Sequence, residues 1–239
     1  AARADVVLLK PVDVGRGNGR LYYEVPNRGG QGILRRLQFA TAAPAAGDPA
    51  GFGDGWLLRQ GFSIAWMGWQ WDVPDEPGRL RLRAPVATDR GRPIEGLVRA
   101  VVITDERKAD APLGAQGHEA YPPSDPDGPD SRLFVRDHAG DAPRELPRAA
   151  WRFLPGGRVA LDGGFRPGRI HEVVYRARDP RVAGVSLAAT RDLVSFFKNE
   201  AGDANPLAGT RLAIGHGISQ SGRFLRHFLH QGFNEDEQG

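Results

Sequence analysis

The sequence predicts an α/β fold, with a doubly wound, mostly parallel sheet that a β-rich insertion interrupts. Apolar runs of strand length alternate with helical patterns in residues 1–72 and again in residues 181–239. Residues 73–180 instead carry several short strand patterns and no strong helical period. Without this insertion, strands and helices alternate in the order that a parallel sheet with crossover helices requires. We therefore expect residues 1–72 and 181–239 to form an incomplete α/β core around a separate β-rich insertion.

The first segment is expected to contribute strands and one short helix to this core. Residues 4–12 and 20–25 are apolar runs joined by a glycine-rich turn, and we expect them to form a hairpin-like pair. Asp54 is a candidate cap for a short helix over residues 55–60. Residues 62–71 are too short and too closely flanked by glycine for a buried helix, so they are predicted to be a central strand.

The insertion is predicted to consist of strands joined by turns that are rich in glycine and proline. Its first strand alternates apolar and charged residues, as a half-exposed strand does. Its histidines, His118, His138 and His171, show no metal-ligand spacing such as H-E-x-x-H, so we expect surface or loop positions for them. The strand candidates are residues 79–86, 97–103, 132–135, 158–161 and 170–175.

The last segment is predicted to place a serine between a strand and a helix. Residues 185–200 have a helical pattern that Ser186 is expected to cap. Residues 212–214 are predicted to be a short buried strand, and residues 215–222 a tight turn. An amphipathic helix follows and is expected to stop at Gly232. Its apolar face carries Phe224, Leu225, Phe228 and Leu229.

The residues around Ser219 match the requirements of a nucleophile elbow, in which a strained strand-to-helix turn holds a serine hydroxyl out of the chain. Such a serine needs small neighbours because backbone segments come close, and Gly217 precedes it by two residues. The common pattern is G-x-S-x-G, and here Ser221 replaces the last glycine, with Gly222 one residue further. The N–H of Gln220 would face a developing oxyanion. Ser221 is the alternative nucleophile, although its own neighbours at the same spacing are Ser219 and Arg223.

Two further stretches are candidates for the same site. The loop after the strand over residues 20–25 would supply a second oxyanion N–H from Arg28 or Gly29, or it would be purely structural. Trp66 is expected to pack in the core. Trp69, Gln70 and Trp71, at the end of the predicted central strand, either pack there as well or line a substrate pocket at the carboxyl edge of the sheet.

A phosphate-binding loop and an incidental serine are the competing explanations of the elbow. Gly215 and Gly217 match the start of the dinucleotide pattern G-x-G-x-x-G, but Gln220 stands where the third glycine belongs. The pattern G-x-x-x-x-G-K-[ST] is absent too. A nucleotide-binding domain is therefore disfavoured, and an ordinary strand-turn-helix remains the alternative to a catalytic serine.

Composition excludes several other functions. The 32 basic residues against 29 acidic residues give a net charge of only +3, and no basic patch interleaved with aromatic residues indicates nucleic-acid binding. The chain has no cysteine, which excludes disulfides and thiolate metal sites, and we expect no metal or cofactor. No apolar run reaches membrane-spanning length. The abrupt ends of the sequence suggest a fragment, which would be exported if a signal peptide precedes residue 1; localisation and oligomeric state stay open.

The elbow GISQSGRF (residues 217–224) resembles that of the α/β-hydrolase superfamily, and in particular of a group of bacterial α/β-hydrolase-domain proteins. The segments over residues 68–70, 191–196 and 232–236 also resemble that group. The elbow is similar to that of glucuronoyl esterases, which have arginine at the position of Gln220. The resemblance covers most of the chain, though only loosely in the insertion.

This resemblance implies a serine hydrolase of the carboxylic-esterase type, acting through an acyl-enzyme on Ser219 with a small-molecule ester as substrate. In that superfamily the acid and the histidine follow the serine along the chain. The resemblance therefore implies that both lie beyond Gly239 and that the 239-residue chain alone is inactive on esters. The alternative is a non-catalytic binding module of the same fold, because fold alone does not give function.

Overall fold

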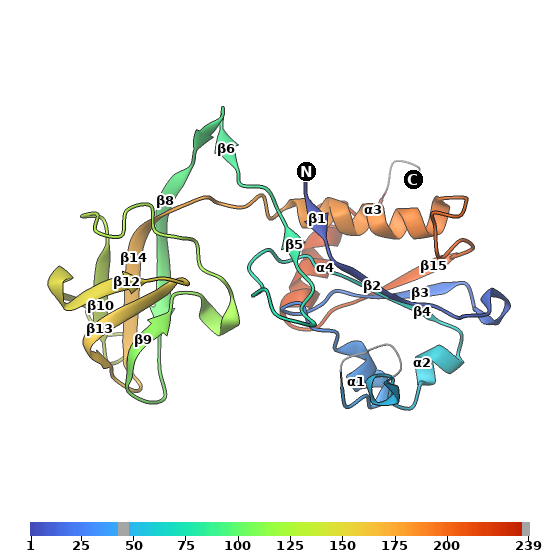
Figure 1. The fold of residues 1–239 in the computed structure, drawn as a ribbon, viewed down its shortest axis with the longest axis horizontal. Helices are drawn as coiled ribbons and strands as arrows, with labels where there is room; N and C mark the ends of the chain where they lie inside the picture. Colours follow the sequence, from blue (N-terminus) through green and yellow to red (C-terminus); the bar gives the residue numbers. More distant parts are fainter. Residues whose placement is uncertain (43–47, 236–239) are drawn as a thin grey trace. The chain divides into compact units, whose positions relative to one another are not determined.

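The computed structural model describes residues 1–42 and 48–235, and it divides the chain into two compact units (Figure 1). The first unit combines Ala1–Ala84 with Ala183–Gly239, and the second consists of Pro85–Val182. Asp236, at the end of the segment 232–236 that carries part of the family resemblance, lies outside the described residues.

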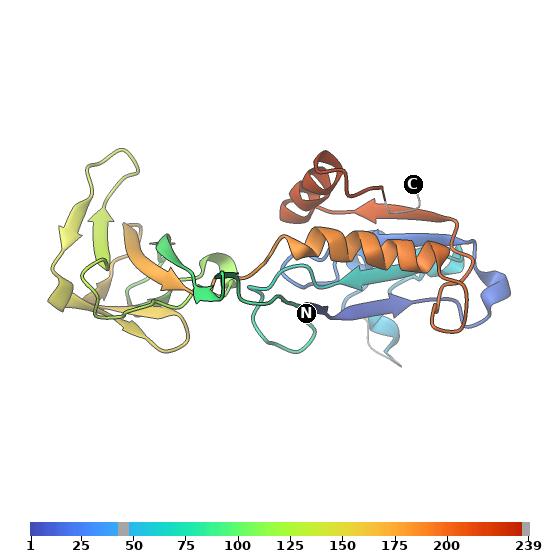
Figure 2. The ribbon, with the colours of Figure 1, turned by 90° about the horizontal axis from the view of Figure 1, so that it is seen from above.

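The first unit is built on a four-stranded sheet with the strand order β15-β3-β4-β2 (Figure 2). β3 (Arg20–Glu24) lies between β15 (Leu212–His216) and β4 (Ser63–Met67), and these three strands are parallel. β2 (Val6–Leu9) pairs with β4 in the antiparallel sense. The short strands β1 (Arg3–Ala4) and β5 (Leu82–Arg83) form a separate antiparallel pair. The register of the parallel strands sets His216, Glu24 and Trp66 side by side at the carboxyl edge of the sheet.

Helices cover both faces of this sheet because side chains alternate between its two faces along each strand. Leu21, Tyr23 and Met67 face α3 (Val185–Asn199) and α4 (Gln220–His230), which bury Phe197 and Phe224 against them. The opposite face buries Ile64 and Trp66 against α1 (Ile33–Gln38) and α2 (Trp56–Arg59). Figure 1 shows α3 on one side of the sheet and both α1 and α2 on the other. The 3₁₀ turns η1 (Val14–Arg16) and η2 (Pro49–Gly51) lie in the connecting loops.

The second unit consists of antiparallel sheets with a core of its own. β11 (Arg144–Leu146), β10 (Arg132–Arg136), β14 (Ile170–Arg178) and β8 (Glu95–Val102) form one sheet in that order. β12 (Trp151–Leu154), β13 (Arg158–Phe165) and β9 (Lys108–Pro112) form another, and β6 (Thr88–Asp89) and β7 (Arg92–Pro93) form a hairpin. The 3₁₀ turns η3 (Ala115–Gly117) and η4 (Arg148–Ala150) complete the unit. Fully buried residues of its core include Leu133, Val159, Phe165 and Val173.

The predicted doubly wound, mostly parallel α/β sheet is wrong. Strand accounts for 32% of the structure and helix for only 20%, and the strands are divided among several separate sheets, most of them antiparallel. Within the described chain, parallel pairing is confined to β15, β3 and β4. The physical reason is that residues 85–182 contribute most of the strands, and these pair in the antiparallel sense, in part across long stretches of chain, as β8 does with β14 and β9 with β13. This β-rich architecture is also at odds with the α/β-hydrolase fold that the resemblance implies.

Several local expectations also fail where long-range pairing decides the structure. Residues 4–12 and 20–25 form no hairpin, because β2 pairs with β4 instead. The strand over residues 212–216 is not buried, since β3 is its one partner in the described chain and Leu212 stays 50% exposed. Ser186 does not cap α3, which begins after Gly184. His171 is a buried residue of β14 and not a surface residue.

Candidate active site

The turn between β15 and α4 holds Ser219 in a strained backbone conformation. Its φ of 59° and ψ of −116° lie outside the regions that residues other than glycine ordinarily adopt. The side chain of Ser219 is exposed. Such strain persists only where the surrounding structure fixes the backbone, and it is commonest at functional sites. A strained serine between a strand and a helix is the backbone arrangement that a nucleophile elbow requires.

Two glycines allow the end of the strand and the first turn of the helix to touch. A Cβ on Gly217 would lie 2.5 Å from the carbonyl oxygen of Ser221, and a Cβ on Gly222 would lie 3.0 Å from that of Gly217. No real Cβ tolerates the first distance against backbone. The spacing of glycine around Ser219 is therefore a steric requirement of this turn.

Burial separates the two candidate nucleophiles. Ser221 is fully buried, and its hydroxyl has no hydrogen-bond partner among the described residues. Ser219 is exposed, and its hydroxyl likewise makes no hydrogen bond within the described chain. A substrate can reach Ser219 directly, whereas Ser221 would have to leave its packed position first.

The N–H of Gln220 is placed to bind a negative charge beside Ser219. Gln220 is the first residue of α4, where backbone N–H groups lack partners in the helix. The N–H groups of Ser221 and Arg223 bond to the carbonyls of Ile218 and Ser219, at 3.2 and 3.0 Å. That of Gln220 has no acceptor in the part of the chain that the structure describes. A free N–H at the positive end of a helix is the type of donor that stabilises an oxyanion.

The loop that holds Arg28 and Gly29 lies beside the elbow. Both residues have positive φ, 50° and 72°, and the N–H of Gly30 bonds to the carbonyl of Asn27 at 3.0 Å, which closes a tight turn. The Asn27 side-chain amide donates to the carbonyl of Ile218 at 3.4 Å and so joins the loop to the elbow.

The two predicted oxyanion donors in this loop differ in availability. The N–H of Arg28 donates to Oε1 of Gln70 at 2.9 Å, so it already has an acceptor. The N–H of Gly29 has none among the described residues, although its carbonyl accepts from the N–H of Leu80 at 3.0 Å. Gly29 also packs against the backbone of Leu80, where a Cβ would come within 2.8 Å. The loop is therefore rigidly braced, and Gly29 has the available donor.

Trp69 and Gln70 make contacts that support the loop and the elbow. The Trp69 ring packs on Phe224 of α4 with 4.5 Å between centroids, and its Nε1 donates to the carbonyl of Pro26 at 2.6 Å. Gln70 is only 5% exposed and holds the Arg28 N–H. The Trp71 carbonyl accepts from the Arg81 guanidinium at 3.4 Å. Trp66 is fully buried, as predicted.

Glu24 lies under the site at the end of β3, and the sequence analysis missed it. Its carboxylate is 3% exposed and accepts from the N–H of Ile33 at 2.8 Å and from Nε1 of Trp66 at 2.5 Å. Arg36 approaches it at 3.5 Å. Burial raises the pKa of Glu24 above its usual value, while the two hydrogen bonds and the nearby His216 and Arg36 oppose the shift. The available signal was a charged residue at the end of an apolar strand.

The histidines of the described chain do not supply a base to Ser219. His216 bonds through Nδ1 to the hydroxyl of Tyr22 at 3.2 Å, and its buried Nε2 has no described partner. His227 and His230 are exposed on α4. Within the described residues no group of three histidine, cysteine or acidic side chains can hold a metal ion, and no helix is long and apolar enough to cross a membrane. The described site therefore comprises the exposed Ser219 and the N–H groups of Gln220 and Gly29, which have no acceptor among the described residues.

Comparisons of this chain with protein-family models, with curated proteins and with solved structures found no match. The family resemblance of the elbow residues therefore stays a prediction. The features that point to a function are the geometry of the turn between β15 and α4 and its contacts with the loop over residues 26–30.

Proposed function

We propose that this chain carries the nucleophile and the oxyanion donors of a serine hydrolase that cleaves carboxylic esters. The observation that carries the proposal is the strained, exposed Ser219 between a parallel strand and a helix, with Gly217 and Gly222 in backbone contact around it. The proposal depends on this local geometry and requires no particular overall fold.

The reaction follows from the chemistry of these groups. The Ser219 hydroxyl attacks the ester carbonyl and loses its proton to a base, and the alcohol leaves as the acyl-enzyme forms. Water then hydrolyses the acyl-enzyme. The N–H of Gln220 and that of Gly29 stabilise the oxyanion of each tetrahedral intermediate, at about 3 kcal/mol for each donor. Arg28 is the alternative second donor, provided that its N–H is released from Gln70.

The base is the element that the described residues lack. No described histidine hydrogen-bonds to Ser219, so we place the histidine and its acid partner in sequence beyond Gly239, as the resemblance implies. Trp69 and Gln70 hold the loop and the elbow together, and Trp71 lies beside them at the same edge of the sheet. The substrate is a small-molecule ester, and no metal or cofactor takes part in the mechanism.

A non-catalytic binding module is the second candidate function. The specific observation in its favour is that the Arg28 N–H, the first predicted donor of the loop, is occupied by Gln70 at 2.9 Å. In such a module the tight elbow would serve only to join β15 to α4.

Ester turnover distinguishes the two functions. In the full-length protein, Ser219→Ala should reduce the hydrolysis of a p-nitrophenyl ester by about 10³-fold or more, whereas the matched variant Ser221→Ala should retain most of the activity. Absence of turnover by the folded full-length protein on a panel of acyl chain lengths would favour the binding module. Turnover by the 239-residue chain alone, lost in Ser219→Ala, would refute the placement of the histidine.

A further inference from the structure

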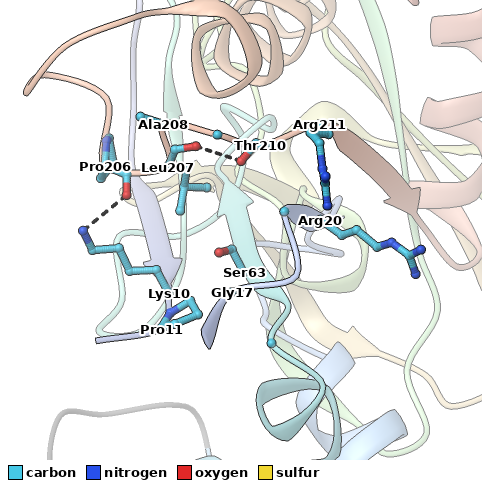
Figure 3. A pocket seen from close by; sticks show the side chains of 13 residues that line it. Lys10, Pro11, Gly17, Arg20, Ser63, Pro206, Leu207, Ala208, Thr210 and Arg211 are labelled. Carbon is cyan, nitrogen blue, oxygen red and sulfur yellow. Dashed lines mark hydrogen bonds between the residues drawn. The ribbon is translucent and has the colours of Figure 1, made fainter. Parts of the chain in front are cut away.

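A cleft of about 300 Å³ opens at the other end of the same sheet, where the parallel strands begin (Figure 3). The start of β3, the start of β4 and the segment before β15 form three of its walls, and the chain after β2 forms the fourth. The residues that line the cleft include Lys10, Gly19, Arg20, Ser63, Thr210 and Arg211. This cleft is separate from the candidate active site, which lies at the carboxyl ends of the same strands.

Backbone hydrogen bonds fix the walls of this cleft. The N–H of Asn18 bonds to the carbonyl of Gly61 at 3.0 Å, and the N–H of Arg211 bonds to the carbonyl of Gly19 at 2.8 Å. Gly61 has a φ of 79°, and a Cβ there would lie 2.6 Å from the carbonyl oxygen of Arg16. The three loops are therefore bound to one another and shape the cleft before any ligand arrives.

Three cations line the cleft without a carboxylate to neutralise them. Lys10 Nζ donates to the carbonyl of Pro206 at 3.2 Å, and the Arg211 guanidinium donates to that of Asn18 at 3.3 Å. Both acceptors are neutral, and Arg20 at the rim makes no ion pair with any described residue. No acidic side chain is among the described residues that line the cleft. Elsewhere, in contrast, many arginines pair with carboxylates, among them Arg83 with Asp5 and Arg132 with Glu145.

Neutral hydrogen-bond donors accompany this positive charge. The Ser63 hydroxyl has no hydrogen-bond partner within the described chain, and Figure 3 shows it between the Lys10 side and the Arg20 side of the cleft. The Thr210 hydroxyl, in contrast, already donates to the carbonyl of Leu207 at 2.9 Å. Glycines at 17, 19, 61 and 209 leave the backbone accessible along the walls. Uncompensated cations together with hydroxyl and backbone donors are the groups that bind phosphate oxygens.

We propose that this cleft binds a small, multiply charged phosphate anion, with Lys10 and Arg211 as charged ligands and Ser63 as a hydroxyl donor. Figure 3 shows the Arg20 side chain directed away from Lys10, so Arg20 acts as a cation at the rim that strengthens the positive field. Free inorganic pyrophosphate and the diphosphate group of a small ester share this chemistry. The site is independent of the proposed hydrolase reaction, because none of its residues belongs to the elbow or to the loop over residues 26–30.

Isothermal titration calorimetry with inorganic pyrophosphate, at constant ionic strength, tests the proposal. Lys10→Gln and Arg20→Gln should each weaken binding by about fivefold, and the double variant by about 25-fold, because each removes one positive charge of the cleft. Arg35→Gln is the matched control, since it removes an exposed arginine of α1 outside the cleft. This control and Ser219→Ala should bind as the wild type does.

Three outcomes would overturn the proposal. The first is that the folded wild-type chain binds neither pyrophosphate nor methyl diphosphate. Comparing the affinities for these two ligands also shows whether the cleft prefers a free anion or an esterified one. The second is an equal loss in Arg35→Gln, which would show a response to net charge alone. The third is unchanged binding in the double variant. Circular dichroism of each variant separates these outcomes from misfolding.

Discussion

At the scale of single residues, the conformation of Ser219 determines what the elbow can do. A serine with φ of 59° and ψ of −116° costs on the order of 1–3 kcal/mol relative to an unstrained residue. The surrounding contacts must compensate for this cost, and the glycine pair at 217 and 222 provides the close packing that does so.

We predict that Gly217→Ala destabilises the protein by about 2 kcal/mol or more, because its Cβ would lie 2.5 Å from the carbonyl of Ser221. Gly215→Ala is the matched control two residues earlier, where a Cβ would meet only the side chain of Leu225, at an ordinary 3.5 Å. Urea unfolding of the two variants measures the difference. Equal stabilities would show that the elbow is not tightly packed.

Ser219→Gly should increase the free energy of unfolding by about 1 kcal/mol relative to Ser219→Ala, because glycine adopts positive φ without strain. The greater conformational entropy of glycine in the unfolded chain offsets only part of this gain. Both variants lack the hydroxyl, so the comparison isolates the backbone. Ser221→Gly against Ser221→Ala gives the control at an unstrained helical position, where glycine should be the less stable residue. If Ser219→Gly is no more stable than Ser219→Ala, the strain is absent.

At the scale of elements, Glu24 connects the end of β3 with β4 and α1. It accepts hydrogen bonds from Trp66 of β4 and from the first N–H of α1, at Ile33. These bonds fix the carboxyl edge of the sheet on which both the elbow and the loop over residues 26–30 stand. Burial nevertheless raises the pKa of this carboxyl, so its ionised form is disfavoured in the folded state.

The raised pKa of Glu24 predicts a pH dependence with a definite sign. Above pH 4.5, the ordinary pKa of this carboxyl, Glu24 loses its proton in the unfolded chain before it does so in the folded protein. The free energy of unfolding of the wild type, relative to that of Glu24→Gln, should therefore fall as the pH rises from 4.5 towards the pKa of Glu24 in the folded state. Urea unfolding of both proteins between pH 4 and pH 8 measures this difference, and other titrating groups cancel. A relative stability that rises with pH would contradict the direction of the shift.

At the scale of the whole molecule, the second unit is one continuous stretch of chain between the two segments of the first, and it has a hydrophobic core of its own. The ends of residues 85–182 are paired with each other, through bonds from Val182 N to Pro85 O at 3.0 Å and from Ala87 N to Pro180 O at 2.7 Å. The unit has its own buried cluster, which includes Trp151 at 2% exposure.

We predict that residues 85–182 fold on their own. Trp151 is the one tryptophan in this segment, so its fluorescence should report a cooperative urea transition of the isolated unit. The Trp151→Phe variant is the matched control and should remove the fluorescence signal while circular dichroism still reports the transition. Loss of structure over a broad, non-cooperative range would show that the unit depends on the rest of the chain.

Local patterns in the sequence predicted the elbow, whereas the pairing of strands could not be predicted. The strand before Ser219 and the amphipathic helix after it are confirmed as β15 and α4, because turn chemistry and helical period lie within one short stretch. The sheet partners of β2 and the antiparallel sheets of residues 85–182 depend on contacts far apart in the chain. The same holds for the bond from the Arg28 N–H to Gln70 Oε1, because only the placement of the two loops together shows that this predicted donor is occupied.

The most direct test of the central claim is the position at which a fluorophosphonate reacts with the full-length protein. After labelling and proteolysis, peptide mapping by mass spectrometry should find the adduct on Ser219, with no labelling in Ser219→Ala and full labelling in Ser221→Ala. That result would establish an activated serine at the apex of the turn. An adduct on Ser221, or a folded protein that does not react, would contradict the assignment of Ser219 as nucleophile.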